Sequence, residues 1–198
     1  VAPQTTRSIV LPILEQASGL RAGNDFGVAM NPEFLREGSG VYDFLNPDKI
    51  VIGAIDEKSF VILEELYKAF NEKIPRIKTD ATTAEMIKYT QNSMLATKIS
   101  FINEIANICE KINVDVSEIA HAIGLDPRIG PKFLNAGIGF GGSCFPKDVK
   151  ALIATSKSLN VEPSLLESVM LVNERQPHRV VELAKDAIGD LKNKKIAV

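Results

Sequence analysis

Residues 83–112 read TAEMIKYTQNSMLATKISFINEIANICEKI, a run that contains neither proline nor glycine. Apolar residues recur along it at helical spacing, and Thr82 followed by Glu85 has the pattern of a capping box. We therefore predict one long helix, about 45 Å from end to end at 1.5 Å per residue. A helix of this length is expected to act as a backbone for packing on more than one side. Cys109 lies on its apolar stripe and is predicted to be a core residue.

The segments before this helix alternate between short apolar runs and helical patterns. The predicted strands are residues 26–30, 49–53 and 76–78, and the predicted helices are residues 5–18 and 57–70. This alternation is typical of a parallel α/β sheet. We therefore expect the back half of a Rossmann-like domain here.

Mainly helical patterns follow the long helix. Helices are predicted at residues 115–123, 146–159, 163–176 and 178–188, with Gly124 and Gly189 as stop signals, and residues 194–198 resemble the start of a strand. The predicted fold class is α/β plus all-α. We expect three domains: an α/β part at 1–80, a central helical part at 81–175, and the start of a second Rossmann-like domain at 176–198. Both ends look cut from a longer protein.

Composition narrows the class of protein. The chain has 198 residues, of which 45% are hydrophobic and 24% charged, which is typical of a globular domain. A net charge of -2 with scattered basic residues argues against nucleic-acid binding, and no apolar run is long enough to span a membrane. Two cysteines without a disulfide pattern favour the cytoplasm. His121 and His178 have no nearby partner ligands, so no metal site is expected.

The stretch 140–148, FGGSCFPKD, is the strongest chemical signal. Pro146 favours the first turn of a helix, which places Cys144 at the positive end of the helix dipole. That position favours the thiolate and predicts a nucleophile, although a free cysteine is more commonly a small buried residue. Asp148 is either a base beside the thiol or an acid that complements the dipole. Lys147 is a candidate for attracting an anionic cofactor.

Two further groups suggest an active site. Lys88 and Asn92 share one helix face, where a cation and an amide can stabilise an oxyanion; the alternative is a solvated polar pair. Glu33 and Glu37 lie in a polar loop after a predicted strand, where ligands bind in open α/β sheets, although ordinary surface charges would look the same. The irregular residues 126–142 carry five glycines and are candidates for ligand contact.

Four motifs occur in an order that resembles the UDP-glucose/GDP-mannose dehydrogenase family. They are NPEFLRE at 31–37, Lys88-x-x-x-Asn92, Phe101-x-Asn103-Glu104, and GGSCFPKD at 141–148. The resemblance implies oxidation of the primary alcohol of a nucleotide sugar to a carboxylate, with two NAD per turnover. It also assigns residues 1–80 to the C-terminal part of an NAD-binding domain. The glycine-rich dinucleotide turn and the part that binds the nucleotide are expected outside this chain.

The resemblance also implies roles for individual residues. Cys144 would attack the aldehyde and carry the thioester, Lys88 and Asn92 would hold the oxyanion, and Asp148 would transfer a proton through water. Glu37 would assist hydrolysis of the thioester, and Glu33 would position the reacting groups. The implied substrate-binding residues are Glu33, Phe34, Leu35, Arg36, Glu37, Lys88, Asn92, Arg128, Phe133, Leu134, Asn135, Ala136, Gly137 and Gly141. Glu37 and Lys147 are implied to lie near NAD.

The resemblance further implies a homodimer built on the long helix, with Arg128 reaching the partner subunit. UDP-glucose is the favoured substrate, with GDP-mannose or a UDP-N-acetyl-hexosamine as alternatives. A β-hydroxyacid dehydrogenase also places a lysine and an asparagine one helical turn apart, but it needs no thiol. A non-catalytic helical dimerisation module is a third reading.

Overall fold

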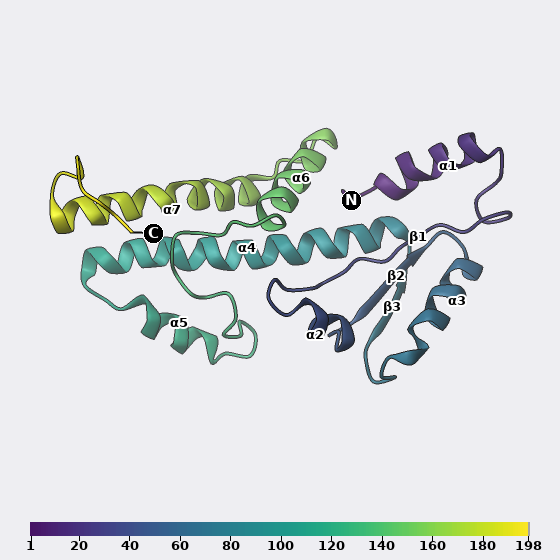
Figure 1. The fold of residues 1–198 in the computed structure, drawn as a ribbon, viewed down its shortest axis with the longest axis horizontal. Coiled ribbons are helices and arrows are strands. Elements are labelled where there is room, and N and C mark those ends of the chain that lie inside the picture. Colours follow the sequence, from purple (N-terminus) through teal and green to yellow (C-terminus); the bar gives the residue numbers. More distant parts are fainter. Residues whose placement is uncertain (198) are drawn as a thin grey trace. The chain divides into compact units, whose positions relative to one another are not determined.

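The structure is a computed structural model that describes residues 1–197. The chain forms two compact units, Val1–Gln91 and the part from Asn92 onward. Helix α4 (Ala81–Ile112) contributes residues to both units, and it runs without a break (Figure 1). The predicted long helix is therefore confirmed, beginning two residues earlier than expected. The expected domain limits stay predictions.

The first unit contains a three-stranded sheet in the order β1-β2-β3. β2 (Ile50–Ala54) and β3 (Arg76–Thr79) are parallel, joined by α3 (Glu57–Leu66) and the short 3-10 helix η2 (Tyr67–Ala69). β1 (Ala29–Met30) pairs with β2 in the antiparallel sense, so the sheet is mixed rather than wholly parallel. No long helical crossover joins these two strands; the connection carries only the short, unpredicted α2 (Gly40–Leu45).

One side of β2 forms the core of this unit. Ile50 and Ile52 pack with Phe60 of α3, and half-buried apolar residues surround them, namely Ala54, Leu63, Tyr67, Phe70 and Ile74. Gly53 is the point where the strand approaches α4. A Cβ at Gly53 would lie 2.6 Å from both the Ala84 Cβ and the Asp80 carbonyl oxygen. A residue without a side chain is therefore required there.

The start of α4 differs from the predicted capping box. Asp80 caps the helix: its carboxylate accepts from the Thr83 N–H at 3.0 Å and from the Thr83 hydroxyl at 2.6 Å. These hydrogen bonds lower the pKa of Asp80. Glu85 is fully buried and instead accepts from the backbone N–H of Thr6 at 2.8 Å and its hydroxyl at 2.6 Å. The capping-box prediction was wrong because a partner 79 residues away competes for the Glu85 carboxylate.

The N-terminal helical segment consists of a π-helical turn, η1 (Thr6–Val10), followed by α1 (Leu11–Ser18). It ends at Gly19, which adopts a left-handed conformation with φ 71°. A glycine tolerates this conformation without steric cost, so the predicted helix and its stop signal are confirmed.

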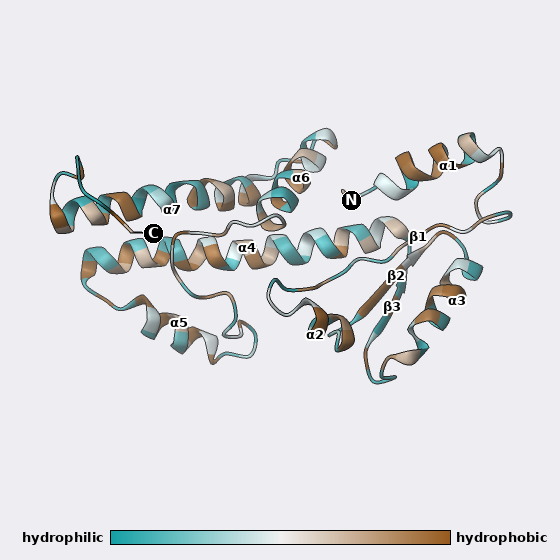
Figure 2. Cartoon of the chain, viewed as in Figure 1, coloured by the Kyte–Doolittle hydropathy of each residue, from teal (hydrophilic) through white to brown (hydrophobic). Residues whose placement is uncertain are grey.

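The second unit is helical. After α4 come α5 (Val116–Gly124), α6 (Phe145–Ser158) and α7 (Ser164–Ile188), and apolar and polar residues alternate along α4 and α7 (Figure 2). Helices α4 and α7 run parallel with a constant offset of 69 residues. The contacts that show it are Ser100 hydroxyl to Val169 carbonyl at 2.8 Å, Asn107 to Gln176 at 3.2 Å, and Arg179 to Glu110 at 2.9 Å. Ala96, Val149, Val169 and Met170 form the apolar core between α4, α6 and α7.

Helix α7 is continuous through Pro177, where two separate helices were predicted. Proline removes one backbone hydrogen bond, but residues on both sides of it are held to α4. Gln176 is buried beside Asn107, and Arg179 pairs with Glu110. Tertiary packing therefore overrides the local break signal. Gly189 ends the helix as predicted, whereas Gly124 is the last residue of α5 and packs on Pro131.

The strand expected at the end of the chain is not present among the described residues. No strand is assigned to residues 189–197, and Val198 lies outside the described residues. A strand needs a neighbouring strand for its hydrogen bonds, and none of the three described strands pairs with this segment.

The close approach of β2 to α4 makes a specific prediction. We expect Gly53→Ala to lower the free energy of unfolding by about 1–3 kcal/mol, because the new methyl group meets backbone atoms that cannot rotate away. Urea unfolding followed by circular dichroism measures the change. Gly40→Ala is the matched control, since a Cβ there has no atom within 4 Å. Equal losses in the two variants would contradict the close contact.

Candidate active site

Cys144 is exposed and occupies the N-cap of α6. The helix begins at Phe145, so Pro146 is its second residue rather than its first, and the predicted place of the thiol just before the helix is confirmed. The Ser143 hydroxyl lies 3.6 Å from the Cys144 sulfur. Gly142, with φ 74°, makes the left-handed turn that leads into this position. An exposed sulfur at a helix N-terminus can reach a ligand.

Cys109 provides the contrast. Its side chain is only 3% exposed on α4, and it is a free thiol like Cys144. The prediction that Cys109 is a core residue is confirmed.

Asp148 is a buried carboxylate in the first turn of α6, with 2% of its surface exposed. It accepts a hydrogen bond of 2.6 Å from the Asn92 side-chain amide on α4 and another of 2.6 Å from the Lys147 ammonium. Its backbone N–H donates to the Cys144 carbonyl at 2.9 Å. The amide nitrogen of Asn92 carries a second hydrogen that this bond does not use. The nucleophile candidate is thus one helical turn from a carboxylate whose position α4 determines.

The glycine-rich loop before Cys144 is held by two asparagines. The Gly137 N–H donates to Asn103 of α4 at 2.7 Å. Asn173 of α7 binds both backbone groups of Phe140, accepting from its N–H at 2.7 Å and donating to its carbonyl at 3.0 Å. A Cβ at Gly139, where φ is 97°, would lie 2.6 Å from the Asn173 side-chain oxygen. Asn103 belongs to the motif Phe101-x-Asn103-Glu104, whereas no sequence pattern indicated a role for Asn173.

Other residues predicted to bind substrate in this loop have different surroundings. Leu134 is buried, with 3% of its surface exposed. Phe133 adopts φ 66° and packs against Phe145 in a tilted arrangement, with ring centroids 6.1 Å apart. Arg128 is exposed, but its guanidinium pairs with Asp126 of the same turn. The remaining predicted residues of the loop are exposed or half-buried: Asn135, Ala136, Gly137 and Gly141.

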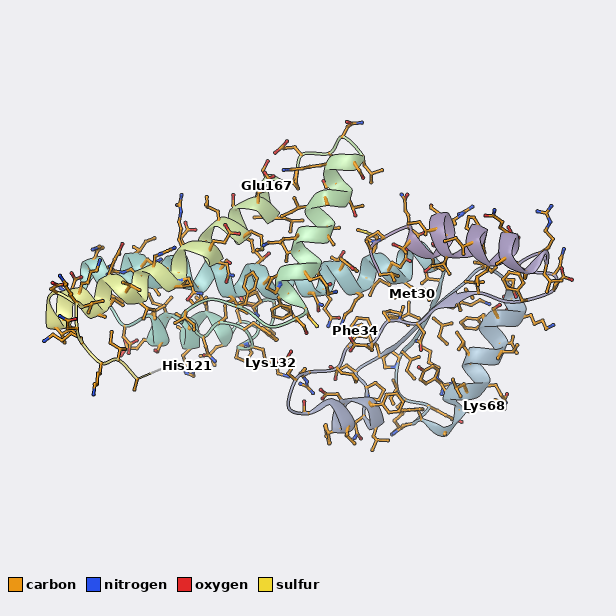
Figure 3. All side chains as sticks on the ribbon, turned by 45° about the horizontal axis from the view of Figure 1, so that its top comes forward. Met30, Phe34, Lys68, His121, Lys132 and Glu167 are labelled. Carbon is orange, nitrogen blue, oxygen red and sulfur yellow. The ribbon has the colours of Figure 1, made fainter. Side chains whose placement is uncertain are left out.

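A second group of predicted residues lies in the first unit. Lys88 is held by an ion pair with Glu33, with 3.2 Å between ammonium and carboxylate. Phe34, labelled in Figure 3, lies close to two cations: the Lys49 nitrogen is 4.1 Å and the Lys88 nitrogen 5.4 Å from its ring centroid. Lys49 also donates to Gln91 at 2.6 Å. Neither Lys49 nor Gln91 was predicted, although Gln91 is three residues from Lys88 and shares its helix face.

The loop at 31–39 is fixed by side chains rather than by regular structure. Asn31 donates to the Val51 carbonyl at 2.7 Å and accepts from the Tyr67 hydroxyl. The Glu33 carboxylate accepts from the Leu35 N–H at 2.6 Å. These bonds anchor the start of the loop to β2 and η2 and orient Glu33.

Arg36, a predicted ligand, is engaged within the protein. Its guanidinium forms a bidentate pair with the carboxylate of Asp43 on α2. The backbone N–H of Arg36 donates to the same carboxylate at 2.9 Å. The Arg36 hydrogen bond holds the pKa of Asp43 well below its usual range, against the opposing effect of burial. Glu37 is exposed and makes no ion pair or hydrogen bond with another residue of 1–197.

The predicted catalytic residues therefore form two groups. Lys88 lies with Glu33, and Asn92 lies with Asp148 and Lys147. Lys88 and Asn92 occupy successive turns of α4, as predicted. Each of the two donors is bonded to a carboxylate of its own unit.

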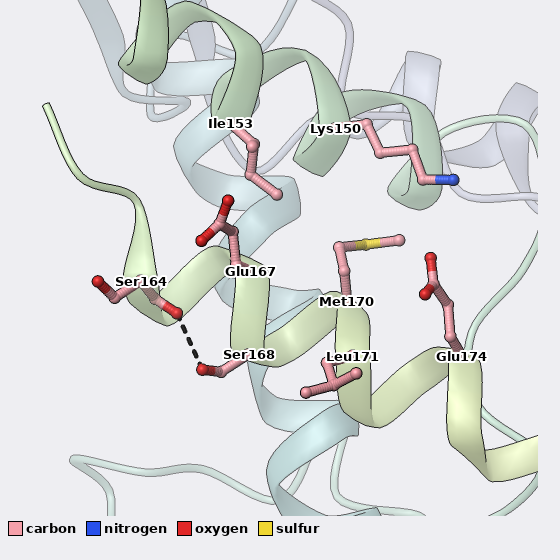
Figure 4. A pocket seen from close by; sticks show the side chains of 8 residues that line it. All are labelled: Lys150, Ile153, Ser164, Glu167, Ser168, Met170, Leu171 and Glu174. Atoms are coloured by element: carbon pink, nitrogen blue, oxygen red, sulfur yellow. Dashed lines mark hydrogen bonds between the residues drawn. The ribbon is translucent and has the colours of Figure 1, made fainter. Parts of the chain in front are cut away.

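A cavity of about 610 Å³ lies between α6 and α7 (Figure 4). Its lining residues are Lys150, Ile153, Ser164, Glu167, Ser168, Met170, Leu171 and Glu174. None of these was predicted to bind substrate or cofactor. Within residues 1–197 there is no helix long and apolar enough to cross a membrane, and no group of three metal-ligating side chains.

The chain matches two sequence models of one family. Residues 1–71 match the NAD binding domain of the UDP-glucose/GDP-mannose dehydrogenase family, and residues 82–175 match its central domain. Among curated relatives, the chain is 48% identical over 201 residues to the UDP-glucose 6-dehydrogenase AglM of Haloferax volcanii. That match covers 100% of the chain and 46% of the relative, so the chain spans about half the length of the relative.

Solved structures give the same picture. A UDP-glucose dehydrogenase from Pyrobaculum islandicum superposes with a TM-score of 0.89 at 44% identity, over 96% of this chain and 43% of the other. A UDP-D-ManNAc dehydrogenase from Pyrococcus horikoshii has a TM-score of 0.85 at 32% identity, over 94% and 43%. The α/β plus helical fold class is confirmed.

The Arg36–Asp43 pair predicts a pH dependence of stability. Because folding lowers the Asp43 pKa, the pair stabilises the folded state fully above the ordinary carboxyl pKa of about 3.9. The stabilisation declines as the pH falls below that value towards the lowered folded-state pKa. We expect Asp43→Asn to reduce stability at pH 7 and to differ progressively less from the wild type between pH 4 and pH 2. Urea midpoints across this range measure the difference.

Glu37→Gln is the control for this experiment, because Glu37 is an exposed carboxylate in the same loop. Its urea midpoint should follow the wild type at every pH. A loss in Asp43→Asn that stays constant down to pH 2 would contradict the proposed linkage.

Proposed function

Because the chain belongs to the UDP-glucose/GDP-mannose dehydrogenase family, we propose that the complete protein oxidises the C6 alcohol of a nucleotide sugar to the carboxylate. The observation that carries this proposal is the exposed Cys144 thiol, one helical turn from the buried Asp148 carboxylate that Asn92 holds. A four-electron oxidation needs a covalent hold on the aldehyde stage, and a thiolate provides it. A two-electron hydroxyacid dehydrogenase and a dimerisation module have no use for this thiol.

UDP-glucose is the proposed substrate. The curated relatives that resemble the chain at 47–52% identity carry the name UDP-glucose 6-dehydrogenase. GDP-mannose and UDP-N-acetyl-hexosamines are the alternatives, since solved relatives with such names share the fold. The choice among these sugars rests on sequence similarity rather than on a residue of this chain.

NAD is the proposed cofactor, and when bound it accepts a hydride in each of the two oxidation steps. Residues 1–71 match the NAD binding domain of the family. Lys147 fits an anionic cofactor because its side chain is 63% exposed in the first turn of α6. Glu37 is likewise exposed and accessible to the cofactor.

The proposed chemistry assigns one task to each residue. The Cys144 thiolate adds to the aldehyde carbon, a carbon–sulfur bond forms, and the carbonyl pair becomes an oxyanion. The second amide hydrogen of Asn92 and the ammonium of Lys88 stabilise that oxyanion. After the second oxidation the carbon is a thioester, and water displaces the sulfur. Asp148 takes the proton from this water.

The two glutamates of the loop assist in this proposal. Glu33 orients the Lys88 ammonium through their ion pair. Glu37 is free of internal partners among the described residues, so it is available to assist hydrolysis of the thioester. The proposed substrate contacts of residues 33–37 and 133–137 are then made by the backbone and exposed side chains of two loops that internal hydrogen bonds hold.

The thiol provides the test of the proposed function. In the complete protein, we expect Cys144→Ser to reduce turnover of UDP-glucose by more than about 10³-fold, as loss of a nucleophile does in other enzymes. NADH formation at 340 nm gives the rate. Intact-mass measurement of the quenched wild type should show a sugar adduct at Cys144. Cys109→Ala is the matched control, and it should retain both the rate and the adduct.

Two results would count against the proposal. Near-normal turnover in Cys144→Ser would favour a hydroxyacid dehydrogenase. Absence of turnover in the wild type with every nucleotide sugar, and no protection of Cys144 from iodoacetamide by those sugars, would favour a non-catalytic module. A higher kcat/KM with GDP-mannose than with UDP-glucose would change the substrate and leave the chemistry unchanged.

We also propose that the protein is a homodimer that associates through α4. Met94, Phe101 and Ile108 repeat every seven residues on this helix and are 58%, 53% and 52% exposed. A stripe of this spacing is the pattern of a helix–helix interface. The exposed Arg128 is proposed to reach the partner subunit. Both cysteines are free thiols, which supports a cytoplasmic location.

The dimer proposal has a direct test in solution. We expect Phe101→Asp to convert the protein to a monomer at micromolar concentration, because a charge in the centre of the stripe cannot be desolvated without a partner. Sedimentation velocity measures the mass. Leu165→Asp on α7 is the control, since this leucine is 67% exposed and lies outside the stripe. A dimer that survives Phe101→Asp would contradict association through this face.

A further inference from the structure

Two lysines of the first unit lie over aromatic rings in the same way but have different partners. The Lys49 nitrogen is 4.1 Å from the centroid of Phe34, and the Lys78 nitrogen is 4.1 Å from the centroid of Phe60. Lys78 also forms an ion pair with Glu57. Lys49 has no such partner: no carboxylate among residues 1–197 forms an ion pair with it, and its hydrogen bond goes to the neutral amide oxygen of Gln91.

The surroundings of Lys49 explain why the ring matters to it. Its side chain is half-buried, and this burial lowers its pKa, an effect to which the nearby Lys88 adds and which Asp48 opposes. A partly desolvated ammonium without a carboxylate depends on other electron-rich groups. The negative face of Phe34 and the Gln91 oxygen are those groups. Phe34 is therefore held by a charge as well as by packing.

The Phe34 ring connects this contact to the candidate active site. Phe34 follows Glu33, whose carboxylate pairs with Lys88 and accepts from the Leu35 N–H. Gln91, the anchor of Lys49, is three residues after Lys88 on α4 and lies on the same side of the helix. Lys49 contacts the Phe34 ring and Lys88 of α4 pairs with Glu33, so both lysines hold the Glu33–Leu35 turn.

We propose that Lys49 is a positioning residue that holds the Phe34 ring, and through it the Glu33–Leu35 turn, in the orientation that the nucleotide sugar requires. The expected effect of Lys49 on substrate binding rests on the proposed function. Its expected effect on the loop does not. Lys49 acts through Phe34 and Glu33, and it touches no reacting atom. Partial burial over an aromatic ring, without a carboxylate in an ion pair, distinguishes Lys49 from an ordinary surface lysine.

The first test is independent of activity. In the complete protein, Lys49→Met keeps an unbranched apolar side chain close to the length of the lysine stem and removes its charge. Hydrogen exchange followed by mass spectrometry should show exchange in the peptide that spans residues 31–39 to be about five-fold faster, the factor expected for a lost cation–π contact. Gln91→Leu should act in the same direction. Lys49→Arg should restore the wild-type rate, since arginine keeps the charge and stacks on rings.

Lys78→Met is the matched control, because it removes the same contact from Phe60, away from the loop. In the Lys78→Met variant, the peptide that spans residues 31–39 should exchange at the wild-type rate. Wild-type exchange in this peptide for Lys49→Met would overturn the inference, and so would equal acceleration by Lys78→Met, since the effect would then reflect general destabilisation.

The second test uses steady-state kinetics of the same variants. Lys49→Met should raise KM for the nucleotide sugar about five-fold and leave KM for NAD within about two-fold, with recovery in Lys49→Arg. An unchanged KM for the sugar in an active Lys49→Met enzyme would overturn the inference while leaving the proposed function intact. Inactivity of the wild type would instead remove the proposed function, and the exchange experiment would then decide the inference alone.

Discussion

The hydrogen bond between Asn92 and the buried Asp148 carboxylate is the constraint on which the second unit's candidate chemistry depends. Burial of a carboxylate is unfavourable unless polar partners compensate for lost water, so this contact determines where the first turn of α6 lies on α4. The Asp148 N–H bonds to the carbonyl of Cys144. The position of the exposed thiol is therefore determined by a buried polar pair rather than by contacts of the thiol itself.

Local patterns predicted most of the fold, and the failures had distant causes. The long helix, the two parallel strands and the helix after Cys144 each follow from the spacing of apolar residues, and from proline and glycine signals, within one segment. The prediction of a capping box was wrong because Glu85 binds Thr6, which lies 79 residues away in the sequence. The predicted helix break at Pro177 does not occur because Gln176 and Arg179 are both held to α4. No window of neighbouring residues contains these partners.

The same distinction applies to the candidate site. Sequence motifs placed Cys144, Lys88 and Asn92 on the right elements, since residue type and helical spacing are local properties. They could not show that Arg36 is engaged by Asp43, or that Asn173 holds the loop before the thiol. Such partners lie on other elements and have no fixed spacing. A motif therefore identifies candidate chemistry but leaves open which side chains are available for a ligand.

The charges around the two candidate groups follow one rule with one exception. Lys88 and Lys147 each pair with a carboxylate, which orients the ammonium group and, for the largely buried Lys88, lowers the cost of holding its charge. Lys49 pairs instead with an amide oxygen and an aromatic face, so its charge is not neutralised. The proposed substrate carries a diphosphate, and a cation without a carboxylate partner attracts such a group more strongly than a paired cation does. The uncompensated Lys49 keeps a positive field at the loop that the resemblance assigns to substrate, and it does so without a direct contact.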